Sequence, residues 1–250
     1  MQLDEPFLVT DIDEKTKIAY TAAYDAIRKA CPRLKLLVAT YFEGLGDNTP
    51  LAVNLPVDAL HIDLVRAPSQ LDDVLAQLPS DKILSLGVVD GRNIWKNDFD
   101  RSLEFIHKAV AGLGTGRVMI AGSSSFLHVP YDLDLETDEE ALTPEIKQWM
   151  AFARQKVEEL ALLKKLTEGD ASVRGRLEEN RRAMESKRTS PLIHNKKVEE
   201  RCAAVSDNDA RRRNPFPVRK KLQQQELQLP SYPTTTIGSF PQTKEARSWR

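Results

Sequence analysis

Side chains that could take part in chemistry follow a set of apolar stretches that have the length of strands. Four such stretches cover residues 36–42, 59–65, 83–89 and 118–122, and a weaker one covers residues 2–9. Because ligands gather at the carboxyl ends of parallel strands, polar residues there could line one pocket and act as acids, bases or acceptors for a cationic substrate. Loop polarity and helix capping explain each of them equally well when it is taken singly. The residues are Asp4 and Glu5, Glu43 with Asp47 and Asn48, Asp63 with Arg66, Asp90-Gly91-Arg92-Asn93, and Ser123, Ser124 and Ser125 with His128.

The histidines and cysteines predict neither a complete metal site nor a covalent nucleophile. His61 lies inside an apolar stretch, where a hydrogen-bonded core histidine is expected, and His107 is expected at the surface or boundary of a helix. Cys31 and Cys202 have neither a Cys-x-x-Cys partner nor a histidine at ligand spacing, whereas a zinc site needs three or four clustered ligands. The serine run at residues 123–125 lacks the Gly-x-Ser-x-Gly frame of a nucleophile elbow. Spacing alone therefore indicates no reaction.

Apolar stripes at helical spacing separate the predicted strands and indicate helices that pack against them. The first helix begins at Asp13-Glu14 and ends before Pro32, and the longest begins at Thr143-Pro144-Glu145 and runs to Leu166. Strands that are apolar along their whole length are typical of a parallel sheet buried on both faces. About five strand–helix units result, which fit either a doubly wound sheet or the later part of a (β/α) barrel. The remaining two helices are predicted around residues 71–78 and 99–110.

Composition and charge restrict the class of protein. The 250 residues carry 36 Lys and Arg against 37 Asp and Glu, a formal net charge of -1, which excludes a globally basic nucleic-acid binder. Between Asp170 and Gln224 apolar residues thin out and basic residues accumulate. This stretch could be a nucleic-acid-binding arm, but a solvated helical connector is favoured, because acidic residues are interspersed and aromatic residues for base stacking are almost absent. No apolar run is long enough to predict a transmembrane helix, and the first residues lack a signal-peptide pattern, so a cytoplasmic location is expected.

Several longer motifs occur in the order found in one known family. They are Asp4-Glu5-Pro6, Thr40-Tyr41-Phe42, His61-Ile62-Asp63-Leu64-Val65, Asp90-Gly91-Arg92-Asn93-Ile94-Trp95, Trp149-Met150-Ala151-Phe152-Ala153-Arg154-Gln155-Lys156 and, above all, the stretch from Pro233 to Thr243. Together they resemble cobalamin-independent methionine synthase, the 5-methyltetrahydropteroyltriglutamate–homocysteine methyltransferase. The resemblance covers essentially the whole chain.

The resemblance implies an architecture of two (β/α)8 barrels joined by a long, polar, helical linker. Residues 1–169 would then form about the last five βα units of the N-terminal, TIM-type barrel. Residues 170–229 would be the basic helical linker, and residues 230–250 would hold the first strand of the C-terminal catalytic barrel. The chain would thus be a fragment of an α/β enzyme of the homocysteine S-methyltransferase family.

The resemblance also implies an activity and a binding segment. The activity is methyl transfer from 5-methyltetrahydrofolate polyglutamate to L-homocysteine, which gives L-methionine. Ile237, Gly238 and Ser239 match the family segment that contacts the amino-acid portion of homocysteine or methionine, where glycine permits a close approach of the backbone.

Zinc is the implied cofactor, and it would activate homocysteine as a thiolate. Its ligands and the catalytic histidine would lie outside this chain, so no catalytic or metal-binding residue is assigned here. Alone, the chain is expected to be inactive, and members of the family are usually monomeric. The alternative is a non-catalytic binding module that uses the basic linker for nucleic acid or a partner protein.

Overall fold

The protein is described by a computed structural model, which places residues 1–234, 243–244 and 248. The chain divides into two compact units, Met1–Ile193 and His194–Arg250. Among the described residues, no helix is both long enough and apolar enough to cross a membrane.

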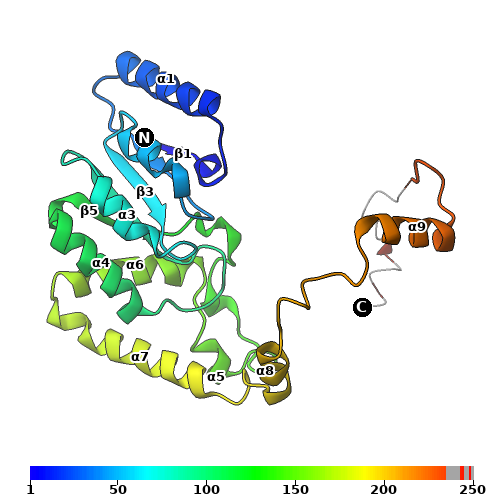
Figure 1. Ribbon diagram of the computed structural model, residues 1–250. Coiled ribbons are helices and arrows are strands. Elements are labelled where there is room, and N and C mark those ends of the chain that lie inside the picture. Colours follow the sequence, from blue (N-terminus) through cyan, green and yellow to red (C-terminus); the bar gives the residue numbers. More distant parts are fainter. Residues whose placement is uncertain (235–242, 245–247, 249–250) are drawn as a thin grey trace. The chain divides into compact units, whose positions relative to one another are not determined.

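The first unit is built on one sheet of five parallel strands (Figure 1). Neighbouring strands in the sheet are also consecutive in the chain, and all four pairings are parallel. The predicted α/β class and all five predicted strand positions are therefore confirmed. The strands are β1 (Gln2–Asp4), β2 (Leu37–Ala39), β3 (Ala59–Asp63), β4 (Ile83–Val89) and β5 (Val118–Gly122).

The two faces of this sheet differ in chemistry. One row of paired residues runs Leu3–Val38–Leu60–Leu84–Val118 and packs in the main hydrophobic core. The adjacent row runs Asp4–Ala39–His61–Ser85–Met119 and points to the other face, because successive side chains of a strand alternate. Complete burial of both faces was predicted from the apolar runs. It holds for β3, whereas β1 and β5 are partly open to solvent.

Four helices connect the strands and supply the other half of that core. They are α1 (Glu14–Ala30), α2 (Thr49–Asn54), α3 (Gln70–Gln77) and α4 (Phe99–Leu113). Asp13 caps α1 by accepting a hydrogen bond from the Thr16 backbone N–H at 2.8 Å, and Asp98 caps α4 through the Arg101 N–H at 3.2 Å. The predicted positions of α1, α3 and α4 are confirmed. The short α2 was not predicted.

The long helix predicted from Thr143 to Leu166 is wrong, because it is interrupted. It forms two helices, α5 (Pro144–Lys147) and α6 (Ala153–Thr167), separated by the segment 148–152. In that segment the Trp149 carbonyl accepts from the Lys96 N–H at 2.8 Å, and the Ala151 N–H donates to the Ile94 carbonyl at 2.9 Å. These sheet-like contacts bury Trp149, which is 1% exposed. They compete with helix continuation for the same backbone groups.

The predicted boundary at residue 169 falls inside the first unit. Helix α7 (Arg174–Thr189) belongs to this unit and packs against α4 (Figure 1). Its Asn180 accepts from the Phe99 N–H at 3.1 Å and donates to the Asn97 carbonyl at 2.8 Å, and its Arg181 pairs with Asp100 at 2.7 Å. Polar contacts thus hold this charged helix against the first turn of α4. Its low apolar content gave no indication in the sequence that it would pack on the first unit.

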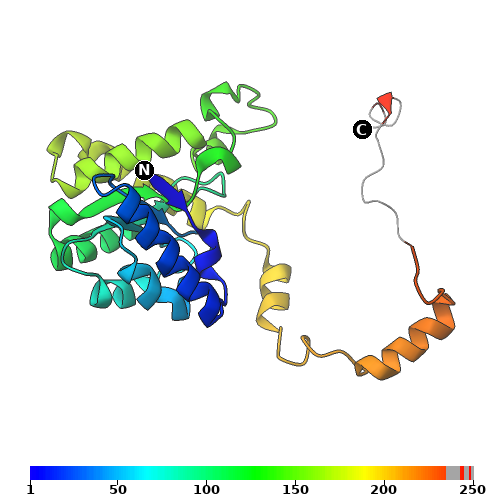
Figure 2. The same ribbon diagram turned by 90° about the horizontal axis from the view of Figure 1, so that it is seen from above.

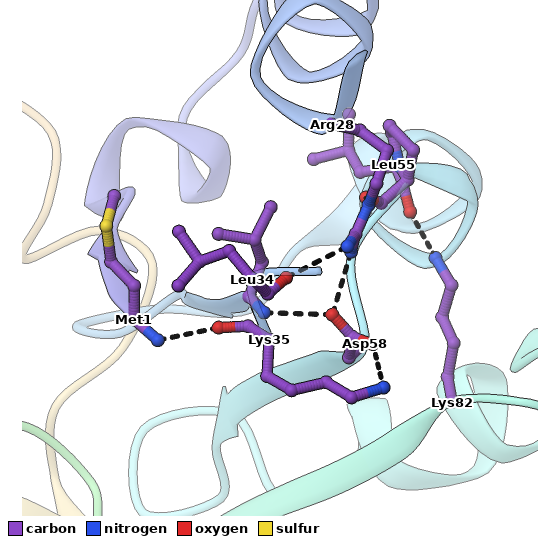
Figure 3. A network of polar contacts seen from close by, with 9 residues as sticks. Met1, Arg28, Leu34, Lys35, Leu55, Asp58 and Lys82 are labelled. Atoms are coloured by element: carbon purple, nitrogen blue, oxygen red, sulfur yellow. Dashed lines mark hydrogen bonds and ion pairs between the residues drawn. The ribbon is translucent and has the colours of Figure 1, made fainter. Parts of the chain in front are cut away.

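Opposite the carboxyl edge of the sheet, a polar network joins the turns before β2, β3 and β4 (Figure 3). Asp58 pairs with Arg28 at 2.7 Å and Lys35 at 2.8 Å and accepts from the Leu36 N–H at 2.9 Å. The buried Lys82 ammonium donates to the Val53 carbonyl at 2.6 Å and to the Leu55 carbonyl, at the end of α2. The network fixes the starts of the central strands.

The second unit contains α8 (Lys196–Ala203) and α9 (Phe216–Leu227), drawn in gold and orange in Figures 1 and 2. Asn195 caps α8 by accepting from the Lys197 and Val198 N–H groups. Neither helix contains a buried residue. The exposed basic groups include Lys196, Lys197, Arg211, Arg212 and Arg213.

Candidate functional site

The polar face of the sheet carries a cavity of about 390 Å³. Asp4, His61 and Ser85 stand in one row across β1, β3 and β4, so their side chains reach the same hollow. Hydroxyl, imidazole and carboxylate groups gathered in this way can hold a polar ligand by hydrogen bonds. The lining residues are Gln2, Asp4, Leu37, Ala39, Tyr41, His61, Ser85, Met119, Ala121, Gly122, Ser124 and Ser125.

His61 forms the floor of this cavity and is 5% exposed. Its Nδ1 lies 2.9 Å from Ser85 Oγ, and its Nε2 lies 3.4 Å from the Ser123 carbonyl oxygen. Burial lowers the pKa of His61, which favours the neutral ring. A neutral ring with the proton on Nε2 satisfies both contacts, because the serine hydroxyl can then donate to Nδ1. The prediction of a hydrogen-bonded core histidine is confirmed.

Three tyrosines interact with the carboxylates of Asp4 and Glu5 near the carboxyl end of β1. Burial, followed by the charge of Asp4, raises the pKa of Tyr41. The neighbouring Glu5 accepts from the Tyr20 hydroxyl at 2.9 Å and the Tyr24 hydroxyl at 2.8 Å. Glu5 is therefore engaged by α1, whereas Asp4 faces the cavity.

Most other predicted strand-end groups hold loops in place. Asp63 is 1% exposed and accepts from the backbone N–H groups of Phe42, Val65 and Arg66. Asp90 accepts from the Arg92 N–H and from the Asn93 side-chain amide, each at 2.7 Å. Of the predicted carboxylates, all of which the structure describes, Asp4 alone lines this cavity, so the expectation that several carboxylates share it is wrong. Asp63 and Asp90 accept hydrogen bonds from loop residues instead.

Among the other predicted strand-end residues, some bind loop backbone groups and others line the cavity. Asn48 donates to the carbonyls of Leu8 and Thr10, and Glu43 accepts from the Gly44 N–H. Ser123 is buried and accepts from the Gly91 N–H at 3.1 Å, whereas Ser124 and Ser125 line the cavity. A side chain at position 91 would meet Ser124 Oγ at 2.6 Å, so glycine permits this approach.

Helix α6 carries two buried charged residues whose burial was not predicted from the sequence. Lys156 is 0% exposed and donates to the Trp95 carbonyl at 2.8 Å and to Asn93 Oδ1 at 3.3 Å. Glu159 is 5% exposed and accepts from the Asn97 N–H at 2.9 Å. Their three-residue spacing places both on one helix face, but the same spacing on a polar helix ordinarily indicates a solvated face.

The described residues contain no group of three or more His, Cys, Asp or Glu side chains placed to hold a metal ion. Cys31 and Cys202 are exposed free cysteines. The predicted substrate-binding residues Ile237, Gly238 and Ser239 lie outside the described residues.

Comparison with known proteins identifies the family of this chain. A family model described as "Cobalamin-independent synthase, N-terminal domain" matches residues 1–113. The whole chain is 50% identical to a 5-methyltetrahydropteroyltriglutamate--homocysteine methyltransferase of Flavobacterium johnsoniae and 53% identical to that of Cytophaga hutchinsonii, and it covers 33% of each. It is also 50% identical to the Nitrobacter winogradskyi protein of this name, of which it covers 32%.

An α/β protein with a five-stranded parallel sheet is the class that the fold defines. Within that class, the chain belongs to the cobalamin-independent methionine synthase family. It spans about a third of the length of the curated relatives that it matches. A solved structure from Listeria monocytogenes, provisionally assigned as a vitamin-B12 independent methionine synthase, matches 67% of this chain and 47% of its own, at 15% identity and a TM-score of 0.43.

Proposed function

We propose that this chain is part of an enzyme that transfers the methyl group of 5-methyltetrahydropteroyltriglutamate to L-homocysteine, forming L-methionine. The observation that carries the proposal is the identity of about half the residues along the entire chain with relatives that bear this activity in their names. The match extends over the whole length of the chain, and so covers the segments that form the polar cavity.

In this proposal, residues 1–169 form about the last five βα units of a TIM-type (β/α)8 barrel. The sequential order of the five parallel strands supports it, since a doubly wound sheet reverses its strand order at a switch point. Further parallel strands added in the same order between β5 and β1 would close the sheet into a barrel, with the polar face lining its interior. Residues 170–229 would be the linker, although α7 packs on the first unit, and residues 230–250 would begin a second barrel.

The proposed chemistry needs an activated homocysteine thiolate, and zinc would supply that activation in the family. The described residues do not offer a ligand cluster for zinc, so no step is assigned to the metal here. Ile237, Gly238 and Ser239 are proposed to bind the amino-acid portion of homocysteine. The enzyme is proposed to act in the cytoplasm as a monomer.

The test compares the 250-residue chain with the complete product of its gene. Each is incubated with zinc, L-homocysteine and 5-methyltetrahydropteroyltriglutamate, and methionine is measured. Methionine is expected from the complete product and not from the 250-residue chain, which would lack the catalytic barrel. A complete product that folds, binds zinc and forms no methionine would overturn the proposed function. Turnover by the 250-residue chain would overturn its proposed inactivity.

A further inference from the structure

An aromatic and cationic cluster lies where β2, β4 and β5 end. It consists of Phe42, Arg92 and His128, which come from three different loops at the carboxyl edge of the sheet. The cavity-lining residues described above do not include any of the three. Ligands of parallel α/β sheets bind at this edge.

Phe42 holds an unusual backbone conformation. Its φ of 83° lies in the left-handed region, which a bulky non-glycine residue enters only with backbone strain. The buried Asp63 carboxylate fixes this conformation by accepting the Phe42 N–H at 3.0 Å. Conformations of this kind persist where the surroundings enforce them, and they concentrate at ligand sites.

Arg92 lies on the face of that ring. Its guanidinium carbon is 4.6 Å from the Phe42 ring centroid, at cation–π distance. Its backbone N–H is bonded to Asp90, but its side chain forms no hydrogen bond or ion pair with any residue that the structure describes. The guanidinium is therefore oriented by stacking, and its N–H fork remains available for a ligand.

Asp90 and Glu43 are the acidic residues nearest in the chain to Arg92 and Phe42, and each accepts at least one hydrogen bond from its own loop. Both oxygens of Asp90 accept hydrogen bonds, and Glu43 accepts from the Gly44 N–H at 3.2 Å. The exposed His128 ring lies 6.0 Å from the Phe42 ring at 64°, and it can add a second N–H donor. The exposed side chains of Arg92 and His128 thus both offer N–H donors to solvent.

We propose that Arg92, stacked on Phe42 with His128 at the edge of that ring, forms a carboxylate-binding site. The planar fork of a guanidinium matches a carboxylate in bidentate geometry, and stacking on the Phe42 ring holds that fork in one plane. The carboxylate could belong to a small acid or to a glutamyl peptide. This proposal goes beyond the proposed methyl transfer, since it depends on residues of this chain alone.

Titration of the 250-residue chain tests the site by nuclear magnetic resonance of arginine Nε–H groups. The two probes are acetate and the tripeptide γ-Glu-γ-Glu-Glu. A saturable shift of the Arg92 signal is expected with at least one of them. A response to both identifies the isolated carboxylate as the ligand group, and a response to the tripeptide alone identifies a glutamyl chain. Absence of a saturable shift with both probes overturns the proposal.

Three variants separate the stacked fork from simple charge. Arg92→Gln should weaken binding about tenfold or more, as expected for loss of a bidentate charged contact. Arg92→Lys keeps the charge but loses the planar fork, so it should also weaken binding. Arg33→Gln removes the same charge from an exposed turn before β2, at the opposite edge of the sheet, and should leave binding unchanged.

Equal losses in Arg92→Gln and Arg33→Gln, or full binding by Arg92→Lys, would overturn the assignment of the stacked fork. Circular dichroism and urea unfolding confirm that each variant is folded. Because no methyl transfer is measured, a negative result leaves the proposed enzyme function intact, and absence of turnover in the complete protein leaves this site intact.

Discussion

Replacing Glu159 by glutamine should stabilise the protein above neutral pH. The Glu159 carboxylate is buried under α7, and one of its oxygens has no hydrogen-bond partner in the described structure. Burial raises its pKa from 4.5 to about 7, and the Asn97 N–H, Lys156 and Lys96 oppose that rise only in part. The other charged groups lining the same cavity are Lys147, Glu158, Arg176 and Glu179.

The sign of the effect follows from the raised pKa. Between pH 4.5 and about 7 the folded protein retains a proton that the unfolded chain releases, so stability falls as pH rises through this range. Above about pH 7 the folded protein carries the buried charge, and the full cost remains. A rise from 4.5 to about 7 corresponds to about 3 kcal/mol, most of which develops between about pH 5 and pH 8. Glutamine keeps the shape and the acceptor for Asn97 but never ionises.

Urea unfolding of the wild type and Glu159→Gln at about pH 5 and pH 8 measures this difference. The variant should gain up to about 2–3 kcal/mol relative to the wild type between the two conditions. Glu158→Gln is the matched control, because Glu158 is the exposed neighbour of Glu159 and pairs with Arg154 at 3.5 Å. Parallel pH profiles for wild type and Glu159→Gln would refute the assignment of a buried charge at this position.

Two further substitutions test the scaffold. Asp58→Ala should lower the free energy of unfolding by about 1–3 kcal/mol near pH 7, because it leaves Arg28 without its carboxylate partner. The pKa of Asp58 lies well below its ordinary value of 3.8, owing first to the hydrogen bond from Lys35. The ionised carboxylate therefore stabilises the fold fully above about pH 4, and this stabilisation falls as the pH drops below 3.8. The difference in unfolding free energy between wild type and Asp58→Ala should accordingly be smaller in urea unfolding at about pH 3. Gly87→Ala should lower the free energy of unfolding by about 1–3 kcal/mol, because the new Cβ would lie 2.8 Å from the Ile62 carbonyl oxygen. Gly116→Ala should leave it nearly unchanged in the same urea unfolding assay, because, apart from the glycine itself and the adjacent backbone, no atom that the structure describes lies within 4 Å of the new Cβ. Equal stability of the two glycine variants would contradict the close packing of β4.

The sequence predicted those features that depend on short stretches of chain. The apolar runs located all five strands, the Asp13-Glu14 start with its apolar stripe located α1, and an apolar stripe alone located α4. The burial of His61 followed from its place within an apolar run. Propensity, capping and periodicity act between near neighbours, so these features can be read locally.

The tertiary structure decided what distant residues do to one another. It broke the helix predicted from Thr143 to Leu166, because the backbone around Trp149 pairs with residues 94–96. It assigned Asp63 and Asp90 to loop backbones and left Asp4 facing the cavity. The availability of a carboxylate depends on which donors the fold brings to it, and no pattern along the chain records that.

The sequence by itself thus determined an α/β chain with parallel strands, and its motifs determined the family. Only the tertiary structure set the strand register that gathers Asp4, His61 and Ser85 in one row, and only packing made Phe42 a stacked platform for Arg92. The physical reason is the range of the forces involved. Backbone preferences act within a few residues, whereas burial, charge and hydrogen bonding at a site depend on groups that meet only after the chain has folded.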